Sequence, residues 1–565
     1  MPSSSTGRSY GRLIHRHWAW RWDKLFCGRY NICFFDLRLS ILQPLTFKGG
    51  TTASETCEER DIKHSVEETT SEKSEHPPND QTQKADKKNQ LGVCRRLTQY
   101  LLEHGVETHG ITPTTEEQRT DTRIYQLFWL WFSTNFNILA FSTGTVGPTV
   151  FGLGLRSSIV MIIVVDVVTF IIPAYFAVFG PQLGARGMVQ CRFSWGYYGS
   201  IIPSLLNAIS YQGFLILNVI VGGQALAAVS NKIDVTVGIV IVSFISFVVT
   251  FCGYRVIHQF ETFAWVPSAV AFPILLGLAR KHLDPSTFPA TPTPSVASIL
   301  SFISLMGSAN VSWCTITPDY GIFHDKTASK LKVFTYSYLG FLLPSLAWHL
   351  LGAAIAIAAP GVPSWSAGFD ESTNIGGLLA AVIAPAGGFG VFLLVFTALG
   401  TVCACAPSMY TIGLSLMAAS SLFAKIPRYV YTVISVAILI PLAILGAKRF
   451  YNTLVNVLGG IGYWSTSFAS IVLAEHIIFR RSFSPRAYPM QNWDKAKYLP
   501  LGIPAIVSII CSFGVVILCM QQPFYTGPIA KAGTGEIGGA VSLLVSFVVY
   551  VPLRAIERSI WPARS

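Results

Sequence analysis

Two carboxyl side chains lie at the membrane-like, apolar parts of the chain. Asp166 is at the centre of VVDVV, and Glu261 begins an apolar stretch just after Arg255 and His258. An ionised carboxylate is costly inside a bilayer, so such a residue should be neutral, paired or in contact with water. A carboxyl group that gains and loses a proton there could couple proton movement to another process. We rank Glu261 first and Asp166 second for this role; the alternatives are an ion pair of Glu261 with Arg255 or His258 and a structural Asp166.

An aromatic side chain and an amide are four residues apart in the string YQGFLILN. Phe214 and Asn218 at this spacing lie on one face of a helix. An aromatic ring and an amide that share one helix face can present together to a ligand. We therefore predict that the pair faces a binding cavity. The alternative for Asn218 is a hydrogen bond to a neighbouring helix.

The composition indicates that these residues are held by membrane-spanning helices. The chain is 51% apolar and only 12% charged, whereas a soluble domain has about 25% charged residues. Its net charge of +12 fits cations kept in cytoplasmic loops better than nucleic-acid binding, because no basic helix with stacking aromatic residues is present. The sequence contains no zinc-type cysteine spacing, clustered histidines or nucleophile elbow, so we predict no metal, no cofactor and no enzymatic activity.

Apolar segments of membrane-spanning length recur along the chain. About 12 of them predict an all-α protein that crosses the bilayer many times. The segments are 125–152, 158–180, 200–229, 235–253, 262–279, 298–316, 333–359, 388–423, 429–446, 451–479, 499–520 and 537–551.

The first and sixth segments are interrupted by glycine, proline and polar residues. Unwound backbone at membrane depth persists only where it is buried or lines a cavity, and a pair of broken helices marks the binding site of many transporters. The interrupted stretch of the first segment is 135–148, with Asn135 and Asn137 expected to stabilise the broken backbone. Within it we expect unwinding at 139–144, which includes Gly144, and we expect Gly147 and Pro148 to mark where regular helix ends. In the sixth segment we expect the break at Pro318.

Three parts are predicted along the chain: a disordered cytoplasmic tail at 1–96, a transmembrane domain at 97–552 and a short cytoplasmic tail at 553–565. The tail at 1–96 contains a polar run that lacks the apolar content to fold, and its first 50 or so residues are interpreted as a targeting tail or an artefact of the gene model. Both termini are placed inside because the loops on that side carry more cations. Those loops carry Arg186, Arg192, Arg255, Lys326, Lys330, Lys332, Lys425, Arg428, Arg480, Arg481, Arg486, Lys495 and Lys497, against Arg156, Lys232, Arg280, Lys281, Lys448, Arg449 and Lys531 on the other side.

Six strings of residues resemble the nucleobase:cation symporter family, and within it the fungal purine-cytosine permease branch. In order they are GITPTTEEQRTD, WFSTNFNILAFSTGTVGP, FGPQLGARGMVQCRFSWGYYG, GYRVIHQFETFAWVP, WCTITPDY and APSMYTIGLS. The resemblance implies the leucine-transporter-like fold, with two inverted five-helix repeats, broken first and sixth helices and two accessory helices. It also implies that a small planar heterocycle is imported together with a proton across the plasma membrane, by alternating access.

The resemblance also implies roles for individual residues. It gives Trp313 a stacking position against the substrate, and it places backbone groups near Ala140 and Ser142 at the substrate edge. Ser408 of the eighth span comes beside the same site. Because HQFETF is shared with the family, the resemblance supports Glu261 as the proton-coupling residue.

The eighth span departs from the family pattern, in which two asparagines precede a proline and a third follows it. This chain has Ala404, Cys405, Pro407 and Ser408 there. A site that lacks a required hydrogen-bond partner can change selectivity by orders of magnitude. A purine base or cytosine is the first prediction, and the alternatives are a vitamin-type, pyridoxine-like ring or a non-transporting ligand sensor. Sodium is the alternative coupling ion, with hydroxyl ligands from Thr397, Thr401 and Ser408.

Overall fold

The computed structural model describes residues 110–561, except 231, 252–262, 264, 285–287, 289–292 and 370–372. All of these residues belong to one compact unit, Asp80–Ser565. Glu261 and the predicted tail at 1–96 lie outside the described residues, so their assignments stay predictions. The described part is helical almost throughout, and its strands β1 (Gln521–Gln522) and β2 (Tyr525–Thr526) pair in one antiparallel hairpin.

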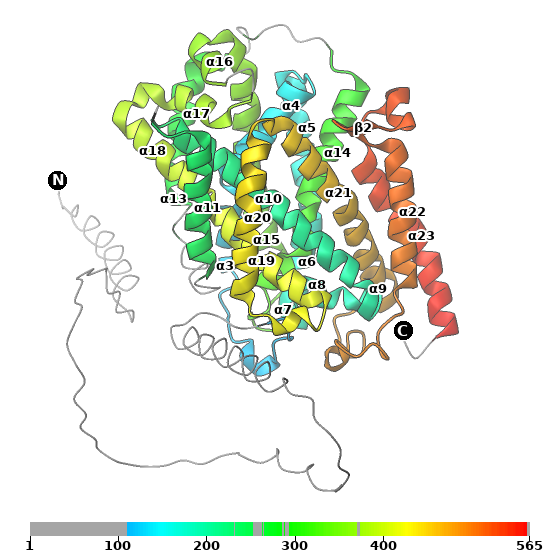
Figure 1. Ribbon diagram of the computed structural model, residues 1–565. Helices are drawn as coiled ribbons and strands as arrows, with labels where there is room; N and C mark the ends of the chain where they lie inside the picture. The colour runs from blue at the N-terminus through cyan, green and yellow to red at the C-terminus, as the bar shows by residue number, and fades with distance from the viewer. Residues whose placement is uncertain are drawn as a thin grey trace, which may run out of the picture. The chain divides into compact units, whose positions relative to one another are not determined.

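The first half of the bundle provides spans one to five. Span one consists of α3 and α4, span two of α5 to α7, and spans three, four and five of α10, α11 and α13, while α8 and α9 connect spans two and three (Figure 1). The bounds are α3 Gln126–Asn135, α4 Ile138–Val150, α5 Leu155–Thr169, α6 Ile171–Ala177, α7 Phe179–Leu183, α8 Gly187–Gln190, α9 Arg192–Gly199, α10 Ile201–Ala227, α11 Val235–Phe251 and α13 Val266–Ala279.

The second half provides spans six to ten and two further spans. Span six consists of α14, η4 and η5, span seven of α15, span eight of α18 and α19, and spans nine to twelve of α20 to α23, while α16 and α17 connect spans seven and eight. The bounds are α14 Val296–Ser312, η4 Trp313–Thr315, η5 Thr317–Tyr320, α15 Lys330–Ala358, α16 Pro363–Phe369, α17 Ile375–Ile383, α18 Gly387–Gly400, α19 Val402–Ala419, α20 Arg428–Ala447, α21 Phe450–Ala474, α22 Ile503–Cys519 and α23 Gly538–Ile560. Shorter helical turns are η1 Glu116–Gln118, η2 Arg280–His282, η6 Ala359–Gly361, η7 Ala384–Ala386, η8 Phe423–Lys425, η9 Glu475–Arg480, η10 Met490–Asn492 and η11 Ala530–Thr534.

The helices have the length and surface of a membrane protein. Among the described residues, 8 helical stretches are long and apolar enough to cross a bilayer, and α4, α11 and α22 are shorter apolar helices. Large apolar side chains on outer helices are exposed, including Val164, Phe244, Ile510 and Leu544. Exposed apolar surface of this kind is stable against acyl chains, which is consistent with the membrane-spanning fold predicted from the sequence.

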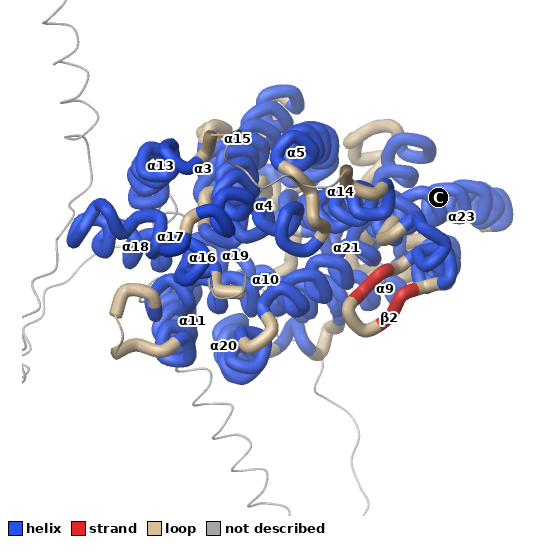
Figure 2. The backbone as a smooth tube through the Cα atoms, turned by 90° about the horizontal axis from the view of Figure 1, so that it is seen from above, coloured by secondary structure: helices blue, strands red, loops and turns tan. Residues whose placement is uncertain are grey.

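The packing of the spans follows the pattern of two inverted repeats. Span one packs on span seven through α4 and α15, and the equivalent pair in the other repeat, spans six and two, packs through α14 and α5. Spans three and eight, which correspond to each other, contact along α10 and α19. Figure 2 shows α4, α10 and α14 toward the middle of the bundle and α18 and α23 at opposite edges.

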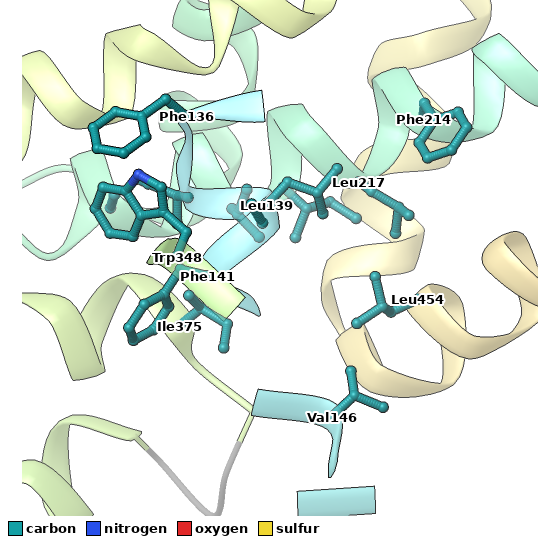
Figure 3. Close-up of a cluster of buried hydrophobic side chains, with 14 of the residues drawn as sticks. Phe136, Leu139, Phe141, Val146, Phe214, Leu217, Trp348, Ile375 and Leu454 are labelled. Carbon is teal, nitrogen blue, oxygen red and sulfur yellow. The ribbon is translucent and has the colours of Figure 1, made fainter. Parts of the chain in front are cut away.

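The break in span one lies before the predicted residues 139–144. α3 ends at Asn135, and α4 begins at Ile138 after an extended Asn137, whose side-chain oxygen accepts a hydrogen bond from the N–H of Ala140. An asparagine at this position is a favoured helix N-cap, so it sets the start of α4. Figure 3 shows Trp348 of span seven between Phe136, which lies in the break, and Phe141 of α4.

Gly144, Gly147 and Pro148 therefore lie within α4 and not in unwound backbone, which corrects the prediction for span one. A Cβ on Gly144 would lie 2.1 Å from the carbonyl oxygen of His349, and a Cβ on Gly352 would lie 2.1 Å from that of Phe141. Small residues let two membrane helices approach closely. Gly144 is thus a packing residue that brings α4 onto α15.

Span six loses its regular helix where it was expected to. α14 ends at Ser312, two short 3₁₀ turns follow, and Ile316 between them has a non-helical backbone. Pro318 lies at the start of the second turn, where its missing N–H costs no hydrogen bond. Asp319 of this turn accepts a hydrogen bond from the N–H of Gly187 at 2.6 Å, which ties span six to the connection after span two.

A buried ionic network joins span twelve to span ten. Arg554 of α23 donates to both carboxylate oxygens of Glu475 at 3.0 and 3.1 Å, and Arg480 also contacts Glu475. Arg554 is fully buried, so these charges compensate one another out of contact with water. α23 continues past residue 552, where we predicted the end of the transmembrane domain, to Ile560.

Candidate functional site

A cavity lies at the level of both helix breaks. It measures about 60 Å³ as the space open to the centres of water molecules. A single water needs about 10–15 Å³ by this measure, so the cavity has room for several waters. Spans one, three, six, seven, eight and ten contribute its wall. The lining residues are Thr134, Asn135, Asn137, Leu139, Ala140, Thr143, Phe214, Asn218, Ala309, Asn310, Trp313, Ser345, His349, Ala404, Ser408 and Leu458.

Two aromatic rings face each other in this wall. Trp313 at the start of η4 and Phe214 of α10 have centroids 5.9 Å apart and an interplanar angle of 25°. Trp131, Tyr211 and Phe341 surround Trp313 and fix its ring. A flat ring placed between two others would need about 7 Å, twice the contact distance of roughly 3.5 Å. A ligand must therefore either separate the two rings or stack beside one of them.

The amide predicted on span three presents an unused acceptor. The Nδ2 of Asn218 donates to the carbonyl oxygen of Phe214 at 2.9 Å, one turn back on α10. Its Oδ1 is buried and has no hydrogen-bond partner among the described residues. A buried acceptor without a partner costs about 1–3 kcal/mol, so this oxygen would gain from an N–H group of a ligand. Both residues line the cavity, as their four-residue spacing predicts.

Span eight contributes small side chains to the cavity wall. Ala404 and Ser408 line the cavity, one helical turn apart on α19. The Oγ of Ser408 donates to the carbonyl oxygen of Ala404 at 2.7 Å. Its hydrogen is therefore already used, and its lone pairs remain available to accept. This wall holds no amide, as the sequence indicates.

The residues of span one only partly match the prediction. Ala140 and Thr143 line the cavity, whereas Ser142 does not: it is fully buried, and its Oγ donates to the carbonyl oxygen of Leu139 at 2.8 Å. Because α4 is regular from Ile138, residue 142 lies on another face of the helix from 140 and 143. The N–H of Ala140 is bonded to Asn137 at 3.1 Å, so it is not free for a ligand.

Asp166 forms part of a polar cluster behind the cavity wall. It is fully buried, its Oδ2 lies 2.8 Å from Nδ1 of His349, and its Oδ1 accepts from Nδ2 of Asn310 at 2.8 Å. Asn310 also donates to Thr169 at 3.1 Å. This answers the question raised by the sequence, because the carboxylate is paired. His349 thus makes a hydrogen bond between helices and also lines the cavity.

The sequence did not predict every polar residue of the cavity wall. Asn310, Ser345 and His349 were not assigned to the site, although each is a polar residue inside an apolar span. The four-residue spacing of Ser345 and His349 on α15 is the signal that would have grouped them. Their approach to Asp166 depends on how spans two, six and seven pack.

The described residues contain no group of three or more His, Cys, Asp or Glu side chains that could hold a metal ion. Of the three hydroxyls considered for sodium, only Ser408 lines the cavity. The Oγ1 of Thr397 donates to Leu393, and that of Thr401 donates to Ala398, each at 2.7 Å within its own helix.

Comparisons with known proteins give the site a context. A family model described as permease for cytosine/purines, uracil, thiamine and allantoin matches residues 113–538. The purine-cytosine permease fcyB of Emericella nidulans is 32% identical over 467 residues, which cover 82% of this chain and 91% of that protein. The vitamin B6 transporter TPN1 of Saccharomyces cerevisiae is 28% identical over 516 residues, which cover 80% and 88%.

A solved structure shares the fold. Mhp1, a nucleobase-cation-symport-1 family transporter in a closed conformation with bromovinylhydantoin bound, superimposes with a TM-score of 0.59 at 16% identity. The match covers 81% of this chain and 97% of Mhp1. This likeness confirms the leucine-transporter-like fold that the sequence predicts, including the two repeats with broken first and sixth helices.

Proposed function

We propose a transport function for this chain, which belongs to the family of permeases for cytosine/purines, uracil, thiamine and allantoin. It carries a small planar nitrogen heterocycle, a purine base or cytosine, into the cell by proton symport. The observation that carries this proposal is the cavity at the two helix breaks, where Trp313 and Phe214 face each other and the Asn218 oxygen has no partner among the described residues. These are the flat faces and the polar edge that a heterocycle requires.

The substrate roles follow from the positions of the side chains. Trp313 covers one face of the ring, and Phe214 covers the other or borders it. The Oδ1 of Asn218 accepts a hydrogen bond from a ring or exocyclic N–H group. Ser408 of span eight accepts a second one, and Ala140 closes the cavity from span one.

Alternating access moves the substrate through the bilayer. Substrate and proton bind together from outside, the two repeats rock about the cavity, and both are released inside. Asp166 and Glu261 are the candidate coupling carboxylates, and Glu261 lies outside the described residues. We place the protein in the plasma membrane, as the family resemblance implies. Both termini lie in the cytoplasm in this proposal, because the loop cations are concentrated on that side.

Competition uptake in a host that lacks its own permeases tests this proposal. Uptake of labelled cytosine or adenine should saturate and should be inhibited by purine bases more strongly than by pyridine vitamins. Stronger inhibition by pyridoxine would favour the vitamin-type substrate, which is supported by the similarity to TPN1 and by the span-eight wall without amides. Retained binding of a base without any uptake would favour the sensor and would contradict the transporter.

A further inference from the structure

The cluster around Asp166 joins the parts of the fold that must move. Its carboxylate on α5 bonds Asn310 of span six and His349 of span seven. The backbone of His349 lies directly against Gly144 of span one. Spans one and seven, and spans six and two, are the equivalent pairs of the two repeats. A change of charge at this cluster therefore acts on all four of these spans, because each of them contributes a contact to it.

The His349 ring connects the cluster to the cavity. Its Nδ1 is held by Asp166 at 2.8 Å, and His349 lines the cavity, whereas Asp166 does not. A carboxylate at Nδ1 favours the tautomer with the hydrogen on that nitrogen. The other nitrogen, Nε2, forms no hydrogen bond with the described residues. In the neutral ring Nε2 is an acceptor, and after protonation it becomes a donor.

Donors in the cavity wall are largely engaged. The side chains of Asn218, Thr143 and Ser408 each donate to a carbonyl oxygen of their own helix. Nδ2 of Asn310 donates to Asp166 and Thr169. Flat nitrogen heterocycles carry acceptor atoms, either ring nitrogens or carbonyl oxygens, as well as N–H groups. A protonated His349 would supply a charged donor for such an acceptor, and charged donors form the stronger hydrogen bonds.

Few other ionisable groups face the pair from the helices around it. From α14 the neighbour is the uncharged Asn310, and from α4 it is the backbone at Gly144. From α15 the phenol of Tyr338 lies near Asp166, and its hydroxyl donates to the carbonyl oxygen of Val167 at 2.8 Å. Asp166 is thus the charge that acts most directly on the His349 ring.

We propose that His349 is the residue that binds the transported proton, and that Asp166 is the positioning residue that stabilises its charged form. This rests on the proposed heterocycle symport. A proton entering from outside adds to the Nε2 lone pair, and the new N–H donates to an acceptor atom of the substrate. Each ligand then raises the affinity for the other, which is the coupling that symport requires. On the inner side the base leaves, and the same proton departs from Nε2 to water.

Transport by the purified full-length protein in proteoliposomes tests the assignment. With an inward proton gradient, the wild-type protein should accumulate labelled cytosine or adenine. His349→Gln should still exchange labelled for unlabelled base but reach only equal concentrations on both sides, with a flat pH profile. Asp166→Asn should keep coupling but move the pH dependence of uptake to the acid side, because the lost carboxylate no longer holds Nδ1 of the His349 ring and no longer favours its charged form.

The matched control is His476→Gln, which changes another buried histidine of the membrane domain that bonds Tyr488 and does not line the cavity. It should accumulate base like the wild-type protein. Gradient-driven accumulation of base by His349→Gln would overturn the assignment of the proton to His349 and would leave the proposed function intact. If His349→Gln does not fold, an unshifted pH profile for Asp166→Asn would overturn it. If the wild-type protein accumulates no base, or accumulates it only with sodium, the proposed function itself fails.

Discussion

Two helix contacts in the core differ in the space that they leave. α4 meets α15 backbone to backbone at Gly144 and Gly352, with no room for a single Cβ. α10 meets α19 closely at its two ends, through the Asn207–Ser415 hydrogen bond of 2.9 Å and the approach of Gly222 to Thr401, and it borders the cavity between them. The first contact therefore holds α4 and α15 together as one tightly packed pair, and the second contact forms part of the wall of a binding site.

The α4–α15 contact should tolerate added side-chain volume least. Gly144→Ala places a methyl group 2.1 Å from a backbone carbonyl oxygen that cannot rotate away. Overpacking of this kind costs about 1–3 kcal/mol, and more where backbone must shift. We expect loss of most folded protein, measured by thermal unfolding in detergent and by the level at the cell surface. Gly514→Ala, where the added Cβ meets nothing within 4 Å, is the control and should behave like the wild-type protein.

The aromatic face of the site is the next most sensitive feature. Trp313→Ala removes the ring that faces Phe214 at 5.9 Å, so saturable uptake should be lost while the protein still reaches the surface. Uptake kinetics and surface labelling would be measured on the same cells. Trp129→Ala removes a half-exposed tryptophan outside the cavity and should leave the KM unchanged. Normal kinetics in Trp313→Ala would show that the ring only packs.

The unpartnered oxygen on α10 should have an intermediate effect. Asn218→Ala removes an acceptor whose hydrogen bond to the base is worth about 1–3 kcal/mol, so affinity should fall by about 5- to 160-fold. The inhibition constants of unlabelled bases give this value. Asn207→Ala is the control on the same helix, because Asn207 bonds Ser415 away from the cavity. An equal loss of affinity in both variants would mean that Asn218 holds the helices and not the base.

Changes at the wall of α19 should be the smallest. Ser408→Ala should alter affinity by less than about threefold, because the hydroxyl hydrogen is already donated to Ala404 and only a weak acceptor is lost. Ser408→Asn adds an amide to this wall and should shift selectivity several-fold toward the bases that present the most donors and acceptors. Inhibition by a panel of bases measures both effects. A large loss in Ser408→Ala would place this wall, and not α10, at the centre of recognition.

The sequence predicts well what depends on local pattern. Apolar length indicates the spans, and the four-residue spacing of Phe214 and Asn218 places both in the cavity wall. The first break lies inside the interrupted stretch 135–148 but before the unwinding expected at 139–144, since glycine and proline were taken as breakers. In a membrane bundle Gly144 serves close packing instead, and the N-cap Asn137 determines the break.

What depends on long-range packing was not predictable from one chain. Asp166 and His349 stand 183 residues apart, and each alone is an isolated polar residue in an apolar span. Only the docking of spans two and seven brings them together and to the cavity wall. The assignment of Ser142 to the site is wrong for a related reason. The face that a residue occupies depends on where its helix begins, and α4 begins at Ile138.

Proteoliposomes containing only the purified full-length protein test the central claim most directly. With an inward proton gradient and no sodium, labelled cytosine or adenine should accumulate above the outside concentration, and collapse of the gradient should release it. Accumulation that requires sodium, or equilibration that ignores the proton gradient, would contradict proton symport of a heterocycle by this protein.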